Sequence, residues 1–304
     1  MKLFWGIDLG GTKIEGVVIG HDPHGKTLSR IRIDTEAEKG YAHIVERVSL
    51  LVSLMSEELG GRGPERIGIG TPGVLDPQHG VMKNCNTTSL NGKPLKTDLE
   101  KALGVPVTLA NDANCFALAE ARLGAARPED PSKEHIVFGV IMGTGVGGGV
   151  VVNGQVLSGC QGIAGEWGHN ELDPKGDLCY CGRRGCVETV LSGPALERYY
   201  HQLSNHRLTL KEITKKADAG DKHALETMER LTSCFGKAIA EVINIIDPHV
   251  IILGGGVGNI ERLYTDGVRE ARKHVFNNRL ETKIVRPMLG DSAGVFGAAM
   301  LVTR

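Results

Sequence analysis

The chain has 304 residues, of which 23% are charged and 41% hydrophobic, and its formal net charge is −1. These values are ordinary for a globular protein of one large or two smaller domains, and the balanced charge leaves no electrostatic footprint for nucleic acid or an anionic membrane surface. The apolar run after Met1 is too short for a signal peptide or a membrane span, so we expect a cytoplasmic protein.

Strands are predicted where apolar residues alternate or form short runs, and helices where they recur at helical spacing. The first part of the chain reads as three strands, a helix, two buried strands and an alanine-rich helix, at residues 3–8, 14–20, 26–34, 39–59, 66–73, 106–112 and 113–124. The second part reads as strand–loop–strand, a long helix, a strand with a glycine loop and a final apolar helix, at 139–152, 222–246, 250–258 and 290–304. This order indicates an α/β protein.

A strand–loop–strand segment occurs twice. GIDLGGTKIEGVVI at Gly6–Ile19 aligns without gaps on GVIMGTGVGGGVVV at Gly139–Val152, and IGIGTPGV at Ile67–Val74 is echoed by VIILGGGVG at Val250–Gly258. Hairpins rich in glycine and valine are common, so one match could be chance, but the matching order of the later elements favours duplication. We therefore expect two similar halves whose glycine loops meet at a cleft.

The glycine loops favour phosphate binding. The first loop combines a carboxylate, two glycines, a hydroxyl and an ammonium in Asp8, Gly10, Gly11, Thr12 and Lys13. Backbone N–H groups of such a turn can cradle phosphate oxygens, and the carboxylate suits hydrated Mg²⁺. One such turn alone would be a plain hairpin. A second hydroxyl-bearing loop, Gly143, Thr144 and Gly145, indicates that the ligand is a nucleoside triphosphate. A later glycine run after a strand would let adenosine lie against bare backbone; it consists of Gly254, Gly255 and Gly256.

Three cysteines and a histidine form a predicted metal site. Cys179, Cys181 and Cys186 follow His169 in a chain with no secretion signal, and four such soft ligands are the set of a structural zinc site with no position left for water. The alternative, free thiols in a loop, is poor for cysteines so closely spaced. Glu166 and Glu188 flank the ligands, so a bound zinc would hold both carboxylates in place.

Asn111 and Asp112 follow a predicted strand and precede a helix. A carboxylate in this place is commonly the helix N-cap. The other interpretation is a general base that accepts a proton from a hydroxyl nucleophile. Position alone does not separate the two.

The chain resembles the ROK family of bacterial sugar kinases and repressors, within the actin-like, ribonuclease-H-like ATPase superfamily. The resemblance covers essentially the whole chain and is carried by DLGGTK, GIGTPG, NDAN, GTGVGGG, GEWGHN, CYCGRRGCVE, DPHVIILGGG and GDSAGVFGAA. Within the family the chain is most similar to bacterial fructokinases, through VMKNCNTTSLNGKPL, AGEWGHN and CYCG.

The resemblance implies two lobes with a cleft between them, each with a mixed sheet flanked by helices. The smaller lobe would be residues 1–112 with the C-terminal helix 291–304 packed back on it, and the larger lobe would be residues 113–290 with the zinc loop. It also implies that Asp112 is the catalytic base. By the same resemblance, the sugar would be bound by Gly73, Asn86, Asn111, Asp112, Glu166, His169 and Glu188.

The implied activity is ATP-dependent phosphorylation of a hexose, with ATP, Mg²⁺ and structural Zn²⁺ as cofactors. Fructose is the first expectation, and the alternatives are N-acetylglucosamine, glucose and mannose. A sugar-responsive repressor would need a DNA-binding domain before Asp8, for which the sequence has no room. An actin-like ATPase or chaperone would lack the cysteine loop. We expect a homodimer, since two-fold symmetry is the commonest oligomeric arrangement.

Overall fold

The structure is a computed structural model of the chain, and it describes residues 2–20, 26–290 and 293–303. Contacts within the chain divide it into two compact units. Unit 1 comprises Met1–Glu129, Gly149–Ala164 and Met288–Arg304, and unit 2 comprises Asp130–Gly148 and Gly165–Pro287.

The first sheet belongs to unit 1 and has the strand order β3-β2-β1-β4-β7. β1 is antiparallel to β2, which is antiparallel to β3, whereas β1, β4 and β7 run parallel. The central strand β4 is buried along its whole length, as expected for a parallel strand covered on both faces. The strands are β1 (Leu3–Leu9), β2 (Lys13–Gly20), β3 (Thr27–Asp34), β4 (Ile67–Thr71) and β7 (Val107–Asn111).

The second sheet repeats this topology with the order β10-β9-β8-β11-β12. β9 and β10 are antiparallel, whereas β8, β11 and β12 run parallel. The strands are β8 (Ile136–Met142), β9 (Val146–Val152), β10 (Gln155–Val156), β11 (Val250–Gly254) and β12 (Lys283–Val285). The matching strand orders confirm the predicted duplication. A separate small hairpin pairs β5 (Val74–Leu75) with β6 (Met82–Lys83).

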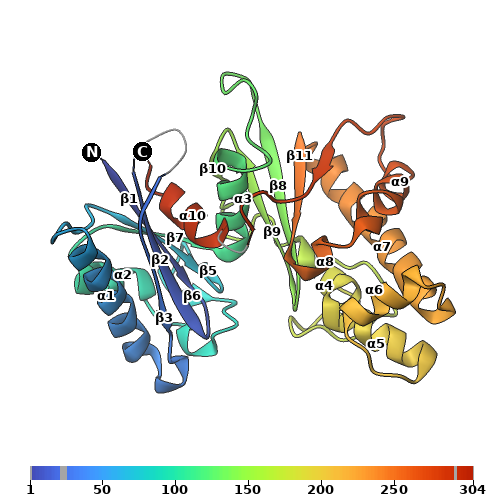
Figure 1. Cartoon of the computed structure of the whole chain (residues 1–304), viewed down its shortest axis with the longest axis horizontal. Coiled ribbons are helices and arrows are strands. Elements are labelled where there is room, and N and C mark those ends of the chain that lie inside the picture. The colour runs from blue at the N-terminus through green and yellow to red at the C-terminus, as the bar shows by residue number, and fades with distance from the viewer. Residues whose placement is uncertain (1, 21–25, 291–292, 304) are drawn as a thin grey trace. The chain divides into compact units, whose positions relative to one another are not determined.

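Helices cover both faces of the first sheet (Figure 1), with α1 and α2 on one face and α10 on the other. α1 turns Ile44, Val48, Leu51 and Met55 into the core, which is the stripe that its sequence spacing predicts. The helices of unit 1 are α1 (Tyr41–Glu58), α2 (Leu95–Leu103), α3 (Asp112–Arg122) and α10 (Ala293–Met300), with the short turns η1 (Ala37–Lys39) and η2 (Thr88–Leu90).

α10 is the expected apolar C-terminal helix, although residues 291, 292 and 304 of that prediction lie outside the described residues. The helix approaches both the sheet and α3 so closely that only glycine fits at the points of contact. A Cβ atom on Gly68 would lie 1.9 Å from the carbonyl oxygen of Ala298, and one on Gly297 would lie 1.8 Å from that of Cys115. The small residues of GVFGAA therefore serve packing.

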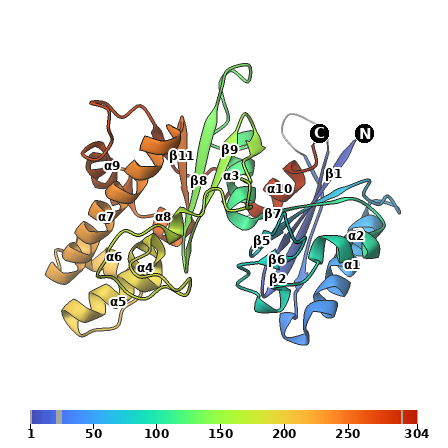
Figure 2. The same ribbon diagram turned by 180° about the vertical axis from the view of Figure 1, so that it is seen from behind.

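The helices of unit 2 lie beside its strands (Figure 2), and the long helix α7 contacts α4, α5, α6 and α9. α7 has the bounds that its sequence pattern predicts. The helices are α4 (Val187–Leu191), α5 (Gly193–Ser204), α6 (Leu210–Asp218), α7 (Lys222–Ile246), α8 (Gly255–Gly258) and α9 (Asp266–Arg272), with η3 (Trp167–His169) and η4 (Glu261–Leu263). In the part of the chain that the structure describes, none of the helices combines the length and apolarity that crossing a membrane requires.

Glu120 is a fully buried carboxylate in unit 1. It accepts hydrogen bonds from the backbone N–H groups of Ala125 at 2.8 Å, Met288 at 3.0 Å and Leu289 at 2.8 Å. Three N–H donors offset the desolvation of one buried charge. The contacts hold the segment that leads into α10 against the end of α3.

Candidate active site

Two carboxylates of unit 1 follow parallel strands. Asp8 lies near the carboxyl end of β1, and Asp112 directly follows β7. β4 lies between these strands, with Gly70 paired to Asp8 on one side and to Ala110 on the other. A Cβ atom on Gly70 would lie 3.3 Å from Cys115 Sγ and 3.4 Å from Asp8 Oδ1, so a side chain here would press on both the buried thiol and the carboxylate.

The two carboxylates influence each other. Burial, followed by the negative charge of Asp112, raises the pKa of Asp8 to about 6. Burial also raises the pKa of Asp112 above its ordinary value, against the opposing hydrogen bond from the Ala113 N–H. Two neighbouring carboxylates without an attached cation repel each other when both are ionised. A bound divalent cation, or a proton acquired in catalysis, would reduce the electrostatic repulsion between the two carboxylates.

The structure distinguishes the two interpretations of Asp112 in part. Asn111 is the N-cap of α3, since its Oδ1 accepts the hydrogen bond from the Asn114 N–H at 2.8 Å. Asp112 Oδ1 accepts from the adjacent Ala113 N–H at 2.8 Å, which is not the bond that a helix N-cap accepts from two or three residues further on. Asn111 therefore caps α3, and the Asp112 carboxylate is not needed as the cap.

The first glycine loop joins β1 to β2 and is closed by a hydrogen bond from Gly10 N to Lys13 O at 3.0 Å. Gly11, Thr12 and Lys13 are exposed. The Thr35 hydroxyl donates to Gly10 O at 2.7 Å. This contact fixes the loop from β3, so that its outer face is presented to solvent in one conformation.

Gly73 and Asn86 lie near each other in unit 1. Asn86 N donates to Pro72 O at 3.2 Å, and a Cβ atom on Gly73 would lie 2.5 Å from Cys85 Sγ. The Asn86 side chain is exposed. The glycine is required by close packing against the neighbouring segment, which is a structural reason for it that sequence reasoning did not consider.

The second glycine loop and the later glycine run meet at one end of the sheet in unit 2. Gly143, Thr144 and Gly145 connect β8 to β9, and the run begins where the parallel strand β11 ends. Gly255 has φ of 78°, and a Cβ atom there would lie 2.3 Å from Met142 O. Both the conformation and the close approach require glycine. A Cβ atom on Gly256 would meet nothing within 4 Å.

Glu188 connects the cysteine loop to the second glycine loop. It lies at the start of α4, two residues after Cys186, and its Oε2 accepts a hydrogen bond from Val146 N at 2.9 Å. A Cβ atom on Gly145 would lie 2.7 Å from the same oxygen. The carboxylate that we expected to serve the sugar alone therefore also holds the glycine loop.

The four predicted metal ligands are brought together in unit 2. One ligand atom from each of His169, Cys179, Cys181 and Cys186 lies within 4.8 Å of all the others. His169 Nδ1 is 3.5 Å from Cys179 Sγ, and Cys181 Sγ is 3.6 Å from Cys186 Sγ. Tetrahedral Zn²⁺ with Zn–S of about 2.3 Å and Zn–N of about 2.0 Å requires ligand separations of roughly 3.5–3.8 Å, so the residues fit this metal.

Trp167 anchors the segment that carries Glu166 and His169. Its indole N–H donates to Gly147 O at 3.1 Å, and its ring meets Phe138 edge to face with 5.9 Å between centroids. Glu166 is partly buried. The sequence analysis missed this anchor. A tryptophan between a predicted sugar-binding residue, Glu166, and a predicted metal ligand, His169, could have indicated it.

Tyr180 is the second residue that sequence reasoning missed. It lies between two of the cysteines, and its hydroxyl oxygen is 3.0 Å from His169 Nε2. The residue is 71% exposed.

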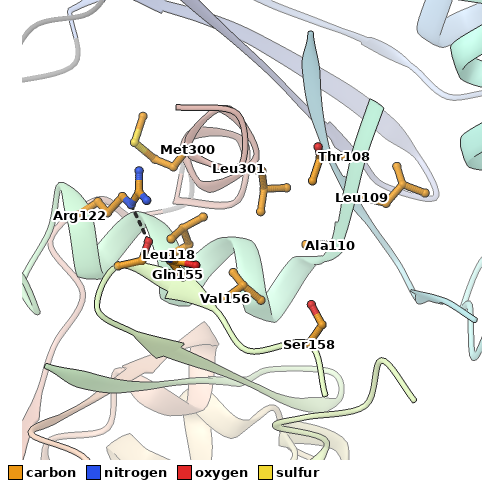
Figure 3. Close-up of a pocket in the computed structure, with 11 residues that line it drawn as sticks. Thr108, Leu109, Ala110, Leu118, Arg122, Gln155, Val156, Ser158, Met300 and Leu301 are labelled. Atoms are coloured by element: carbon orange, nitrogen blue, oxygen red, sulfur yellow. Dashed lines mark hydrogen bonds between the residues drawn. The ribbon is translucent and has the colours of Figure 1, made fainter. Parts of the chain in front are cut away.

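Figure 3 shows a pocket of about 230 Å³ in unit 1, between β7, α3 and the end of α10. Arg122 reaches into its wall and donates from Nε to Gly154 O at 2.8 Å. None of the predicted site residues lines this pocket. The predicted residues instead group within each unit: Asp8, the first glycine loop, Gly73, Asn86, Asn111 and Asp112 in unit 1, and the remainder in unit 2.

Similar proteins place this arrangement in context. A model described as the ROK family matches residues 4–304. An N-acetyl-D-glucosamine kinase of Vibrio cholerae is 36% identical and covers 98% of this chain and 99% of its own. A ROK hexokinase from Thermus thermophilus has a TM-score of 0.86 with 36% identity, covering 99% of this chain and 97% of its own.

A ROK family glucokinase from Streptomyces griseus, solved with glucose and AMPPNP, has a TM-score of 0.77 and 31% identity and covers 99% of both chains. These matches confirm the actin-like fold that the sequence resemblance implies.

The raised pKa of Asp8 predicts a stability effect that depends on pH. The pKa of this carboxyl rises from an ordinary value of 3.8 to about 6 in the folded protein, so the folded state binds more protons between these values and loses stability as pH rises through them. In Mg²⁺-free buffer near pH 7.5, Asp8→Asn should raise the unfolding free energy by about 3 kcal/mol. Urea unfolding across pH would measure it. The gain should vanish below about pH 4, and a gain that persists there would contradict the assignment.

Proposed function

The chain belongs to the ROK family and is a sugar kinase, and we propose that it transfers the γ-phosphoryl group of ATP to N-acetylglucosamine. Relatives that cover almost the whole chain, such as those of Vibrio cholerae and Histophilus somni, carry the name N-acetyl-D-glucosamine kinase. The comparisons support this sugar, an alternative in the sequence analysis, better than fructose, which was the first expectation. No structural observation favours fructose.

The observation that carries a kinase mechanism is the pair of interacting carboxylates, Asp8 and Asp112, at the strand ends of unit 1. In the proposed reaction Asp112 accepts the proton of a primary sugar hydroxyl as its oxygen bonds to the γ-phosphorus. The bond between the γ-phosphorus and the bridging oxygen breaks, and ADP leaves with that electron pair. The raised pKa of Asp112 favours this role, since a carboxylate with a raised pKa is a stronger base.

The glycine loops are proposed to hold the nucleotide. Gly10, Gly11, Thr12 and Lys13 would bind phosphate oxygens through backbone N–H groups and the exposed side chains, as would Gly143, Thr144 and Gly145. Gly254, Gly255 and Gly256 would border the adenosine. Asp8 would hold Mg²⁺, through water, and the cation would neutralise phosphate charge and lower the repulsion between Asp8 and Asp112.

The sugar is proposed to be bound by polar groups that match its hydroxyls. Glu166 and Glu188 would accept hydrogen bonds, and Asn111, Asn86 and the backbone at Gly73 would complete the set, together with His169. Glu188 has one oxygen committed to Val146 N, which leaves the other for this purpose. A carboxylate that accepts two hydrogen bonds suits a pair of vicinal hydroxyl donors.

A zinc ion at His169, Cys179, Cys181 and Cys186 is proposed to be structural. Four protein ligands complete a tetrahedral shell, so no position remains for a reacting water. The ligand segment has little regular structure, with isolated bridges at Glu171–Cys186 and Leu178–Arg184. Metal binding would therefore supply the free energy that orders it.

Three further proposals rest on the resemblance. The functional lobes remain residues 1–112 with 291–304, and residues 113–290. The protein is cytoplasmic and a homodimer, which sedimentation in solution would report as a species of twice the chain mass. A single species of one chain mass at micromolar concentration would contradict the dimer.

The test of the proposed function is ADP release with a panel of hexoses. The purified chain, ATP and Mg²⁺ should give the highest kcat/KM with N-acetylglucosamine, with lower values for glucose, mannose and fructose. Omission of sugar gives the background ATPase rate. A higher kcat/KM for fructose than for N-acetylglucosamine would overturn the proposal in favour of the first expectation.

Asp112→Asn should lower kcat by about 10²–10⁴-fold while the sugar still binds, because the amide retains the shape but accepts no proton. Asp221→Asn is the matched control. Asp221 caps α7 by accepting from Ala224 N at 2.9 Å, so it does the task that Asp112 would do if it were only a cap. Steady-state rates and calorimetric sugar binding separate the two roles. Equal kcat values for the two variants would show that Asp112 is not the base.

Cys181→Ser should lower zinc content and raise KM for the sugar more than KM for ATP. Glu166 and His169 lie on the segment that the metal orders, whereas the Gly143 loop is also held by the bond from Gly193 N to Gly143 O at 2.8 Å. Cys160→Ser, an exposed cysteine outside the cluster, is the control. Metal analysis and titration of sugar and of a non-hydrolysable ATP analogue by calorimetry give the answer. Lost turnover with intact sugar affinity would indicate a catalytic metal instead.

A further inference from the structure

In unit 2, two carboxylates of the cysteine loop, residues 169–186, are paired with arginines of neighbouring helices. Arg230 of α7 donates from Nη2 to Asp173 Oδ2 at 3.4 Å, and Arg198 of α5 donates from Nη2 to Asp177 Oδ2 at 3.3 Å. The two helices also contact each other. The irregular loop is therefore attached through its side chains to two regular helices of the same unit.

Asp173 and Asp177 also bind one residue of the loop through their backbone. Asp173 N donates to Gly185 O at 3.0 Å, and Gly185 N donates to Asp177 O at 2.9 Å. Gly185 has φ of 61°, and a Cβ atom on it would lie 1.6 Å from Asp173 O, so this close approach requires glycine. Gly185 directly precedes the predicted ligand Cys186. A displacement of Asp173 would therefore reach Cys186 through one intervening residue.

The two ion pairs differ in their exposure to water. The side chains of Arg198 and Asp177 are 50% and 55% exposed, whereas those of Arg230 and Asp173 are 29% and 33% exposed. An exposed ion pair contributes little, because water screens the charges and two long side chains lose freedom when they pair. The pair between α7 and the loop is therefore the stronger of the two attachments.

An aromatic ring holds Arg230 in place. The guanidinium carbon of Arg230 lies 4.6 Å from the centroid of the Tyr199 ring, which is within the range of a cation–π interaction. The Tyr199 hydroxyl in turn donates to Glu226 Oε1 at 3.4 Å, one turn earlier on α7. A guanidinium that is already stacked loses less freedom when it pairs with Asp173.

We propose that Arg230 is a positioning residue, which holds Asp173 and thereby keeps the cysteine loop in the arrangement that binds the metal and places Glu188. This inference rests on the proposed function, in which the metal orders the segment beside the sugar. A ligand set that is already ordered loses less conformational entropy when the metal binds, so it holds the metal more tightly.

The test measures zinc release from the full-length holoprotein to an excess of a chromophoric chelator. Arg230→Gln should release zinc roughly tenfold faster than the wild-type protein. Trypsin should also cut the variant faster after Lys175, Arg183 and Arg184, which are exposed on the loop. Arg230→Lys should restore most of the wild-type behaviour, since an ammonium group can still pair with the carboxylate.

Asp173→Asn tests the same contact from the side of the loop. The amide oxygen can still accept from Lys175 N, as Asp173 Oδ1 does at 3.1 Å, but the ion pair is lost. Asp173→Asn and Arg230→Gln should each speed zinc release, and the double variant should release zinc no faster than either single variant. If Arg230→Gln does not fold, Asp173→Asn and Arg230→Lys still test the contact. Unchanged zinc release in the folded variants, or effects that add in the double variant, would overturn the inference.

Arg262→Gln is the matched control. Arg262 is comparably exposed and pairs at 3.5 Å with Asp218 of α6, outside the cysteine loop, so this variant should release zinc at the wild-type rate. Arg198→Gln removes the more exposed attachment and should have a smaller effect than Arg230→Gln. Urea unfolding of every variant separates a general loss of stability from a loosened loop.

Kinetics distinguish positioning from a part in the chemical step. Arg230→Gln should raise KM for the sugar while kcat and KM for ATP change little, because the loop carries sugar-binding candidates and Asp112 lies in unit 1. A fall in kcat with unchanged KM for the sugar would contradict the positioning role.

The wild-type protein separates this inference from the proposed function. If it holds zinc and Arg230→Gln releases zinc at the same rate, only the role of Arg230 is wrong. If it holds zinc but another hexose gives the highest kcat/KM, the proposed sugar is wrong and the role of Arg230 stands. A wild-type protein that binds no zinc would contradict the proposed metal and this inference together.

Discussion

Parallel strand pairing is the constraint on which the functional arrangement depends. Because β1, β4 and β7 run in one direction, and β8 and β11 do the same in unit 2, the loops that follow them emerge at one edge of each sheet. Asp8 and Asp112 reach the same edge from strands whose sequences are about a hundred residues apart. Gly70 on the intervening strand contributes no side chain of its own beside Asp8 and Cys115. The helices on either face cover the apolar strands and leave this edge to polar groups.

In unit 2, hydrogen bonds link the cysteine loop to the second glycine loop. Glu188 is bonded to the glycine loop through Val146 N and is separated from the ligand Cys186 by one residue. Trp167 ties the segment of His169 to β9. The metal ligands, the glycine loop and the sugar-binding candidates of this unit are therefore not independent elements, and disturbance at one ligand would reach the others through a few hydrogen bonds.

The sequence predicted features whose causes are local. The glycine loops, the stripe of α1 and the bounds of α7 follow from spacing and strand patterns, and the gathering of His169 with the three cysteines follows from their closeness in the chain. The sequence did not predict features that depend on partners far away in the chain. Glu120 accepts from N–H groups 168 and 169 residues away, and no pattern in its own helix indicates this. Likewise, that Asn111 rather than Asp112 caps α3 depends on side-chain torsions, which neighbouring polar residues of similar propensity do not determine.

The sequence motifs identify the family of the chain but not the sugar that it phosphorylates. Carboxylates, amides and glycine loops satisfy chemistry common to all hexokinases, so motifs built from them cannot separate one hexose from another. Selectivity needs a group that one sugar satisfies and the others leave without a partner. Such a group has to be held rigidly, or it would turn toward whichever ligand is present.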